Sequence, residues 1–120
     1  MHALIVEDSS TIRKILTAYL TKLGFDVTAA VNGRDGLDCL KAMGKADVVL
    51  VDWNMPEMDG ISFLRAVRAD TAYAALPVMM VTTNTDIANV SEALEAGATE
   101  YIMKPFTADM VREKLELMGL

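Results

Sequence analysis

The chain has 120 residues, which is short enough for one domain and long enough to bury a hydrophobic core. Apolar residues make up 52% of it and charged residues 23%, a composition typical of folded globular proteins and not of disordered or disulfide-built ones. Eleven basic and seventeen acidic side chains leave a net charge of −6, which disfavours direct binding to nucleic acid.

The single cysteine, Cys39, cannot form a disulfide within the chain, and the N-terminus does not resemble a secretory signal. We therefore expect a cytoplasmic protein in which Cys39 packs as a small hydrophobic side chain. No apolar run approaches the roughly 20 residues that a membrane span requires, so we expect no membrane contact. Residues 1–120 are predicted to form one monomeric domain, with Met1 as its native start.

Five apolar, strand-like runs alternate with helix-like segments along the chain. The predicted strands are 3–6, 26–30, 48–51, 77–81 and 100–104. Segments in which apolar residues recur every three to four positions predict helices at 9–24, 33–44, 61–69, 86–97 and 107–119. Because several strands are almost entirely apolar, the pattern favours an α/β fold, with a parallel sheet covered by helices on both faces.

The helical spacing also predicts which side chains face the core. These residues are Ile12, Leu16, Tyr19, Leu23, Leu37, Leu40, Ile61, Leu64, Val67, Ile87, Val90, Leu94, Val111, Leu115 and Met118. Outward positions are expected at Asp86, Asn89 and Glu92. Glycines at the expected helix ends, where left-handed caps are common, are Gly24, Gly44, Gly97 and Gly119.

Polar side chains follow four of the five predicted strands. In chain order they are Glu7, Asp8, Asp52, Thr82, Thr83 and Lys104. Because ligands of open parallel sheets bind at the carboxyl edge, we expect these groups to share one site. Taken singly, Asp8 could cap a helix, Asp52 could open a turn and Lys104 could be an ordinary surface charge. Their joint placement favours a functional site.

Neighbouring carboxylates raise each other's pKa, so three of them cannot all stay ionised without a counter-charge. A divalent cation would supply it. Mg²⁺ fits best, because it takes oxygen ligands in octahedral geometry and keeps exchangeable waters. With Mg²⁺ present, an Asp52 oxygen could attack a phosphoryl group to form an aspartyl phosphate. Lys104 would pair with the phosphoryl oxygens, and Thr82 would donate a hydroxyl hydrogen bond to them.

The sequence resembles the receiver domains of two-component response regulators over its whole length, and most closely the stand-alone chemotaxis-type receivers. The matching segments are VDWNMPEMDG, VTT and EYIMKPFTADMVREKL. The resemblance implies a flavodoxin-like, doubly wound sheet of five parallel strands in the order 2-1-3-4-5. It also implies a signalling domain, not an enzyme, which catalyses only its own phosphorylation and slow autodephosphorylation.

The resemblance implies a role for each residue near the expected metal. Asp52 is the phosphoacceptor, and Asp8 and Asp52 bind Mg²⁺ through their carboxylates. Asn54 contributes its backbone carbonyl, and Glu7 acts through a metal-bound water. Glu7 stands where many family members have Asp, which bears on metal affinity but not on the mechanism. Trp53, by strand alternation, is expected to point away from the core and toward the metal.

The resemblance also implies how a phosphoryl group is held. Thr82 and Lys104 contact it, the Lys104–Pro105 peptide bond is cis, and the backbone freedom of Gly60 is used after the active-site loop. On phosphorylation, Thr82 moves toward the phosphoryl group while Tyr101 turns inward behind it.

The implied output face consists of the fourth helix, the fifth strand and the fifth helix. On it, Met110 and Leu117 are candidate apolar anchors for a partner, or else scattered surface hydrophobes. Thr83 and Asn84 are expected to tune the lifetime of the phosphoryl group.

We expect a switch that accepts a phosphoryl group from a histidine kinase or a phosphotransfer domain and alters binding to a separate, unidentified protein. A phosphate sink without an output partner stays open as an alternative. A Mg²⁺-dependent phosphohydrolase is less favoured, because Asn54 stands where such enzymes usually carry a second Asp. A flavin or nucleotide-binding module is also less favoured, because EDSSTI stands in place of a Gly-rich phosphate loop.

Overall fold

The apolar runs of the sequence form the strands of one parallel sheet. The computed structural model describes residues 1–83 and 87–120. Its strands are β1 (His2–Val6), β2 (Asp26–Ala30), β3 (Val48–Asp52), β4 (Val78–Thr82) and β5 (Glu100–Met103). They pair in the order β2-β1-β3-β4-β5, so the order implied by the family resemblance is confirmed. The central strand β3 has β1 on one side and β4 on the other.

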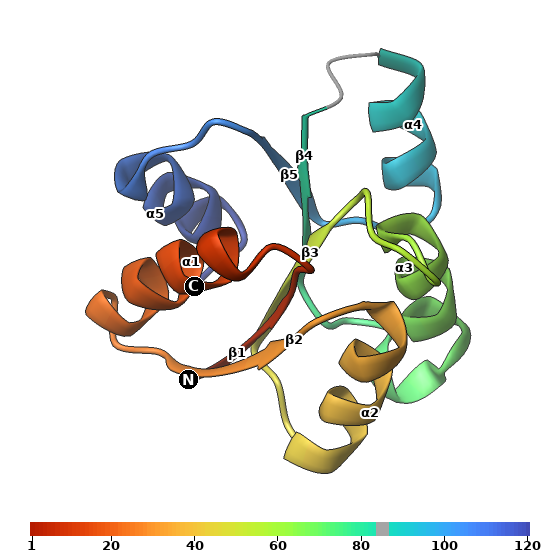
Figure 1. Ribbon diagram of the computed structural model, residues 1–120. Coiled ribbons are helices and arrows are strands. Elements are labelled where there is room, and N and C mark those ends of the chain that lie inside the picture. Colours follow the sequence, from red (N-terminus) through yellow and green to blue (C-terminus); the bar gives the residue numbers. More distant parts are fainter. Residues whose placement is uncertain (84–86) are drawn as a thin grey trace.

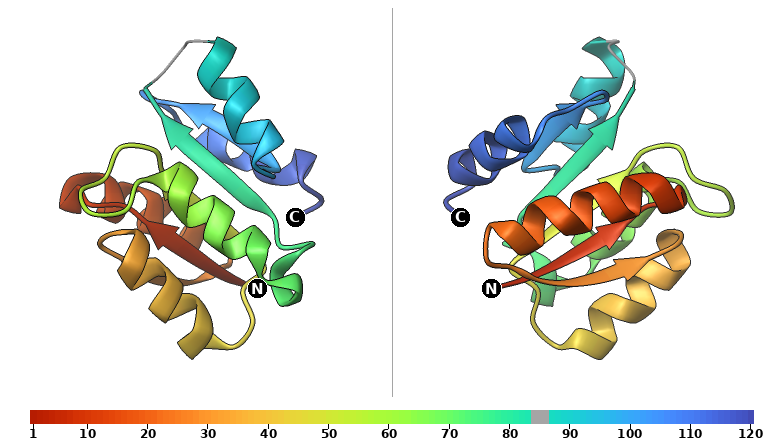
Figure 2. Two further views of the ribbon diagram at one scale, coloured as in Figure 1. Left: turned by 90° about the vertical axis from the view of Figure 1, so that its right-hand side faces the viewer. Right: turned by 60° about the vertical axis from the view of Figure 1, so that its left-hand side comes forward.

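The helices lie on both faces of the sheet, which confirms the doubly wound α/β architecture (Figure 1). On one face lie α1 (Ser10–Lys22) and α5 (Ala108–Leu117). On the other lie α2 (Gly33–Met43), α3 (Gly60–Ala69) and α4 (Ile87–Glu95). A short 3-10 helix, η1 (Thr71–Tyr73), follows α3. Figure 2 shows the same three layers from two other sides.

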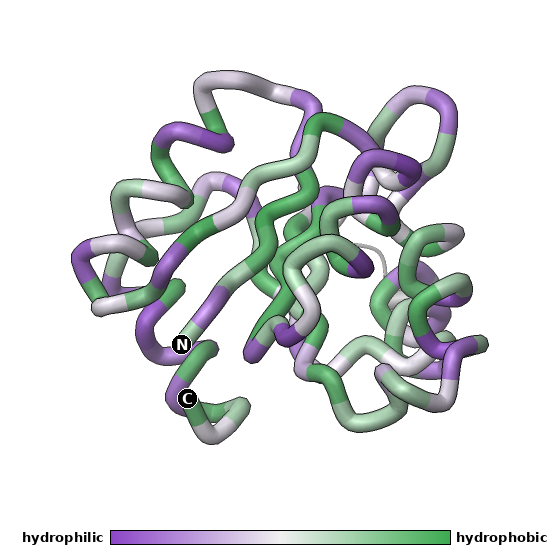
Figure 3. The backbone as a smooth tube through the Cα atoms, turned by 90° about the horizontal axis from the view of Figure 1, so that it is seen from below, coloured by the Kyte–Doolittle hydropathy of each residue, from purple (hydrophilic) through white to green (hydrophobic). Residues whose placement is uncertain are grey.

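The sheet separates two hydrophobic clusters, because successive residues of a strand point to opposite faces. In β3, Val49 and Val51 pack on the side of α2, α3 and α4, whereas Val48 and Leu50 pack on the side of α1 and α5. Figure 3 shows hydrophobic residues concentrated along the strands, while the helices alternate between hydrophilic and hydrophobic. Strands covered on both faces need apolar residues at every position, which explains the nearly unbroken runs in the sequence. In the described part of the chain, no helix has the length and apolar character needed to cross a membrane.

Side chains at the helix starts satisfy backbone N–H groups of the first turn. The capping residues of α1, α2, α3 and α5 are Ser9, Asn32, Asp59 and Thr107. For α1, Ser9 Oγ accepts a hydrogen bond of 3.3 Å from the Ile12 N–H, so the cap is Ser9 and not Asp8. At the helix ends, the four predicted glycines, Gly24, Gly44, Gly97 and Gly119, all have positive φ.

Two predictions of side-chain direction are wrong near α1 and β3. Leu23 is exposed, because it lies beyond the last turn of α1, whose buried row runs through Leu16 and Leu20. Trp53 packs into the cluster under α2, α3 and α4 instead of pointing away from the core. Alternation along a strand predicts only to which face of the sheet a side chain points. Because both faces of this sheet are covered by helices, it does not predict exposure to solvent.

The face of α4 was also predicted incorrectly. Leu94 is 51% exposed, and Ala93 is buried in its place. Asn89, expected to face outward, is half-buried, whereas the Glu92 side chain is 44% exposed and pairs with Arg65 at 3.4 Å, as an outward position allows. Asp86 and the side chain of Ile87 lie outside the described residues. The small side chain of Ala93 gives a weak hydropathy signal, and for this reason the spacing favoured its larger neighbour.

Gly60, the first residue of α3, lies directly against the end of β3. A Cβ at this position would collide with the Asp52 carbonyl oxygen and would lie 2.9 Å from the Trp53 Cα. The Gly60 N–H donates to the Trp53 carbonyl at 2.8 Å, which holds the start of α3 there. Glycine is therefore required here by close approach, and not by a left-handed backbone.

We predict that Gly60→Ala lowers the free energy of unfolding by about 3 kcal/mol, because the backbone of β3 cannot move away from an added methyl group. Gly24→Ala is the matched control. Its Cβ would meet open space, and only its φ of 94° carries strain, so a loss of about 1 kcal/mol is expected. Urea unfolding of both variants measures the difference. Equal losses would show that the contact between α3 and β3 yields easily.

Candidate functional site

Asp52 ends the central strand, and its side chain is buried at the carboxyl edge of the sheet. The residue is only 6% exposed. Strand β1 pairs with β3 through Val6 and Val51, and β4 pairs with it through Val81 and Asp52, so all three strands end at nearly the same level. Groups that follow β1 and β4 therefore lie beside the Asp52 carboxylate, as expected for the carboxyl edge of a parallel sheet.

Two more carboxylates join Asp52 from the residues that follow β1. One oxygen from each of Glu7, Asp8 and Asp52 lies within 4.8 Å of the others. We call these three side chains the acidic cluster. Glu7 is 1% exposed, whereas Asp8 is exposed. An all-carboxylate donor set with one member open to solvent matches the ligands that a hard divalent cation prefers.

Lys104 brings a positive charge to the acidic cluster from the residue after β5. Its ammonium Nζ lies 3.0 Å from Glu7 Oε1 and 3.1 Å from Asp52 Oδ1. Its backbone N–H donates to the Thr82 carbonyl at 2.8 Å, which continues the pairing of β5 with β4. The Lys104–Pro105 peptide bond is cis. The lysine thus reaches past the end of β4 to the end of the central strand.

The pKa values in the site reflect the burial of its charged groups first and their charged neighbours second. Burial raises the pKa of Glu7 to about 7 and outweighs hydrogen bonds from the Ser9 N–H and Lys104, which lower it. Asp8 and Asp52 add to the rise. For Lys104, burial alone would lower the pKa, but its hydrogen bonds and charge interactions with Glu7 and Asp52 leave it above the usual value. The site thus combines buried carboxylates with one ammonium, and its Glu7 carboxyl holds a proton to a higher pH than usual.

The remaining predicted site residues lie at different depths around the acidic cluster. Thr82, the last residue of β4, is buried, whereas Thr83 is exposed. Tyr101 in β5 is half-buried against the cluster under α2, α3 and α4. Asn54 follows the Asp52–Trp53 pair in the β3–α3 loop, with an exposed side chain. Asn84, which was expected to tune phosphoryl lifetime, lies outside the described residues.

One contact of the site was missed by the sequence analysis. The Arg13 guanidinium, from the first turn of α1, donates through Nη1 to the backbone carbonyls of Glu7 at 2.8 Å and Asp8 at 3.0 Å. Every residue has a backbone carbonyl, so a sequence pattern does not show which carbonyl accepts a hydrogen bond. The only signal is the position of Arg13 five and six residues after Asp8 and Glu7. Arg13 ties together the two residues that carry carboxylates into the cluster.

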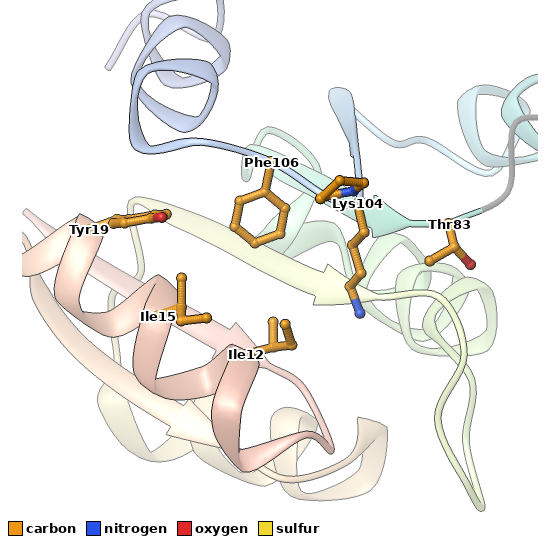
Figure 4. Close-up of a pocket in the computed structure, with 7 residues that line it drawn as sticks. Ile12, Ile15, Tyr19, Thr83, Lys104 and Phe106 are labelled. Atoms are coloured by element: carbon orange, nitrogen blue, oxygen red, sulfur yellow. The ribbon is translucent and has the colours of Figure 1, made fainter.

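An apolar pocket of about 330 Å³ lies beside Lys104, between α1 and the segment that follows β5 (Figure 4). Its lining residues are Ile12, Ile15, Tyr19, Thr83, Lys104, Pro105 and Phe106. The rings of Tyr19 and Phe106 meet edge to face, with centroids 6.3 Å apart. The pocket adjoins the acidic cluster only through Lys104, so it does not itself hold the carboxylates. Local sequence patterns do not predict this pocket, because its wall combines residues from distant parts of the chain.

We predict that Glu7→Gln stabilises the metal-free protein increasingly as pH rises. The folded state raises the pKa of Glu7 from 4.5 to about 7, so the stability from protonated Glu7 is full below pH 4.5 and is lost as pH rises through about 7. The difference in unfolding free energy, variant minus wild type, should grow by on the order of 2 kcal/mol toward pH ~8.

Urea unfolding with a chelator present measures this difference. Glu113→Gln, an exposed change on α5, is the control and should show no such trend. A pH-independent difference for Glu7→Gln would contradict the raised pKa. The raised pKa of Lys104 does not interfere, because that lysine stays charged throughout the range.

Known proteins resemble this chain along nearly its whole length. A family model described as the response regulator receiver domain matches residues 3–116. The chemotaxis protein CheY1 of Helicobacter pylori is 43% identical over 119 residues, which cover 98% of this chain and 96% of that protein. A chemotaxis protein CheY homolog of Campylobacter jejuni is 45% identical over 117 residues, covering 97% and 90%.

A solved structure of a chemotaxis protein also has a similar fold. Chemotaxis protein CheY4 of Vibrio cholerae superposes with a TM-score of 0.92 at 33% sequence identity, covering 98% of this chain and 97% of that one. Receiver domains of this kind are signalling domains and not conventional enzymes. The family match, the relatives and the strand order agree with one another, and the chain therefore belongs to the response regulator receiver domain family.

Proposed function

We propose that this protein is a phosphorylation-dependent switch of a two-component pathway, with Asp52 as the phosphoacceptor and residues 1–120 as one receiver domain. The observation that carries the proposal is the Asp52 carboxylate, which is buried at the end of the central strand, within the acidic cluster, and hydrogen-bonded to Lys104. A histidine kinase or a histidine phosphotransfer domain would supply the phosphoryl group. The names of the bacterial relatives favour a chemotaxis pathway.

In the proposed transfer, a carboxylate oxygen of Asp52 attacks the phosphorus atom of a phosphohistidine. A P–O bond forms and the P–N bond breaks, while the histidine nitrogen keeps the bonding electron pair and takes up a proton. Lys104, which now holds Asp52 Oδ1, would pair with a phosphoryl oxygen. Thr82 ends the neighbouring strand and would donate its hydroxyl hydrogen to another phosphoryl oxygen.

The acidic cluster is the proposed place for the metal. Bound Mg²⁺ would neutralise the carboxylates and the incoming phosphoryl oxygens. Asp8 and Asp52 would hold it through carboxylate oxygens, Asn54 through its backbone carbonyl, and Glu7 through a water molecule. The short distances among the carboxylate oxygens support this assignment. Arg13 supports it too, since it fixes the backbone from which two of these side chains project.

The switch would act through the face formed by α4, β5 and α5. Movement of Thr82 toward a phosphoryl group would let Tyr101 turn inward behind it, and this would change the surface offered to a separate protein. Met110 and Leu117 are exposed on α5, at 36% and 73%, and Met103 is exposed at the end of β5. Exposed methionines suit a partner surface, because their flexible side chains adapt to a second protein.

The alternative reactions have less support. A phosphohydrolase with an Asp nucleophile usually carries a second Asp two residues on, and Asn54 cannot exchange a proton in that role. A phosphate sink would share the chemistry of Asp52 but lack an output partner. A pull-down with and without beryllofluoride separates the two signalling roles, because only a switch gains a partner on activation.

We predict that acetyl phosphate with Mg²⁺ adds one phosphoryl group to the wild-type chain and none to Asp52→Asn. The amide oxygen is a poor nucleophile, whereas the isosteric side chain preserves the packing at the end of β3. Intact-mass spectrometry measures the labelling, and circular dichroism checks the fold. Asp38→Asn, an exposed change on α2, should label like the wild type. Equal labelling of Asp52→Asn would place the phosphoryl group elsewhere.

We also predict that Asp8→Asn weakens Mg²⁺ binding by at least about tenfold, because a direct ligand should matter no less than the outer groups that orient ligands. Isothermal titration measures the affinity, and the fluorescence of Trp53, next to Asp52, reports it independently. Asp26→Asn serves as the control, because Asp26 is exposed and begins β2, at the edge of the sheet opposite to the acidic cluster. Unchanged affinity in Asp8→Asn would remove Asp8 from the metal site.

A further inference from the structure

The open edge of the sheet carries a small charged network that the proposed mechanism does not use. Strand β5 ends the strand order of the described sheet, next to β4. The Tyr101 N–H donates to Glu100 Oε1 at 3.0 Å, so the carboxylate of the preceding residue covers a backbone group of β5. Edge strands expose such groups unless a side chain covers them. Glu100 therefore has a defined position beside the backbone of Tyr101.

Lys114 of α5 binds the same carboxylate oxygen. Its Nζ lies 3.1 Å from Glu100 Oε1, and the two side chains are only 28% and 21% exposed. The same Nζ lies 4.8 Å from the centroid of the Tyr101 ring. A cation at this distance from an aromatic ring is attracted by the negative charge of the ring face, and partial burial strengthens the attraction.

The contact joins the two faces of the sheet across its edge. Tyr101 packs against the hydrophobic cluster under α2, α3 and α4, whereas α5 lies on the opposite face (Figure 1). Lys114 thus reaches from α5 toward a ring that belongs to the other layer. An inward turn of Tyr101 would take its ring away from Lys114, while Glu100 would keep the lysine in place.

We propose that Lys114, held by Glu100, is a positioning residue that keeps the Tyr101 ring in the half-buried orientation of this structure, the outer one of the proposed switch, and so sets the resting balance of that switch. The inference rests on the proposed function in one respect, namely that an inward turn of Tyr101 accompanies activation. The contact of the lysine with the ring in the resting protein stands apart from that. Removing the cation should raise the ratio of inward to outward Tyr101 by roughly two- to tenfold.

The test follows Tyr101 directly. Protein labelled with 3-fluorotyrosine gives fluorine signals from Tyr19, Tyr73 and Tyr101, and Tyr101→Phe assigns the third. A soluble, neutral gadolinium complex broadens the signals of exposed rings, so the broadening of Tyr101 reports how far the ring is turned outward. Measurements use the wild type, Lys114→Met and Lys114→Arg, each with and without Mg²⁺ and beryllofluoride.

Arg112→Met is the matched control, since it removes one positive charge from the same helix. Arg112 pairs with Asp109 and Glu116 on the surface of α5. Glu100→Gln provides a second route, because it weakens the hold on Lys114 while leaving the lysine and the ring intact.

In the resting protein, we expect less broadening of Tyr101 in Lys114→Met, a smaller loss in Glu100→Gln, and wild-type behaviour in Lys114→Arg and Arg112→Met. Beryllofluoride should bind Lys114→Met roughly two- to tenfold more tightly, because its resting state already lies closer to the active one. Equal broadening in Lys114→Met and the wild type would overturn the proposal, and so would a Lys114→Arg variant that behaves like Lys114→Met. If Tyr101 responds to Lys114→Met but never to beryllofluoride, the role of Lys114 in holding the ring is supported and the proposed switch is what fails.

Discussion

The rest of the site depends on one ammonium group placed between two buried carboxylates. Lys104 contacts Glu7 and Asp52 at nearly equal distances, and both acids are almost fully buried. Burying either carboxylate alone would be costly, so the lysine makes their close approach possible. It offsets part of the negative charge of the acidic cluster, while burial above all, and to a smaller extent the neighbouring carboxylates, raises the pKa of Glu7. The folded chain therefore tolerates an unbalanced charge at the place where the proposed chemistry needs a metal and a phosphoryl group.

Much of this arrangement could be predicted from sequence, because it follows from where strands end. Parallel strands buried on both faces must be apolar, so a charged residue after such a run marks the carboxyl edge. The positions of Glu7, Asp52 and Lys104 at strand ends therefore predict that they lie together, and the structure places Lys104 within 3.1 Å of both acids. The strand order came from the family resemblance, and the structure confirms it.

What the sequence could not predict depends on contacts that leave no periodic signal. The Arg13 guanidinium binds backbone carbonyls, and Lys114 meets a ring on the other face of the sheet. Trp53 was misplaced because alternation along a strand does not say whether a face is covered. Leu94 was misplaced because a large apolar residue outweighed the small Ala93 in the hydropathy pattern. Each miss reflects packing between elements, which local spacing does not encode.

The two hydrogen bonds from Arg13 have a consequence for how a cation would be received. Because the carbonyls of Glu7 and Asp8 are already restrained, part of the entropy lost in ordering that turn is lost when the chain folds and not when an ion arrives. The proposed metal site would thus be preorganised before an ion binds. A substitution that loosens the β1–α1 turn would then also lower the affinity of the proposed site for an ion.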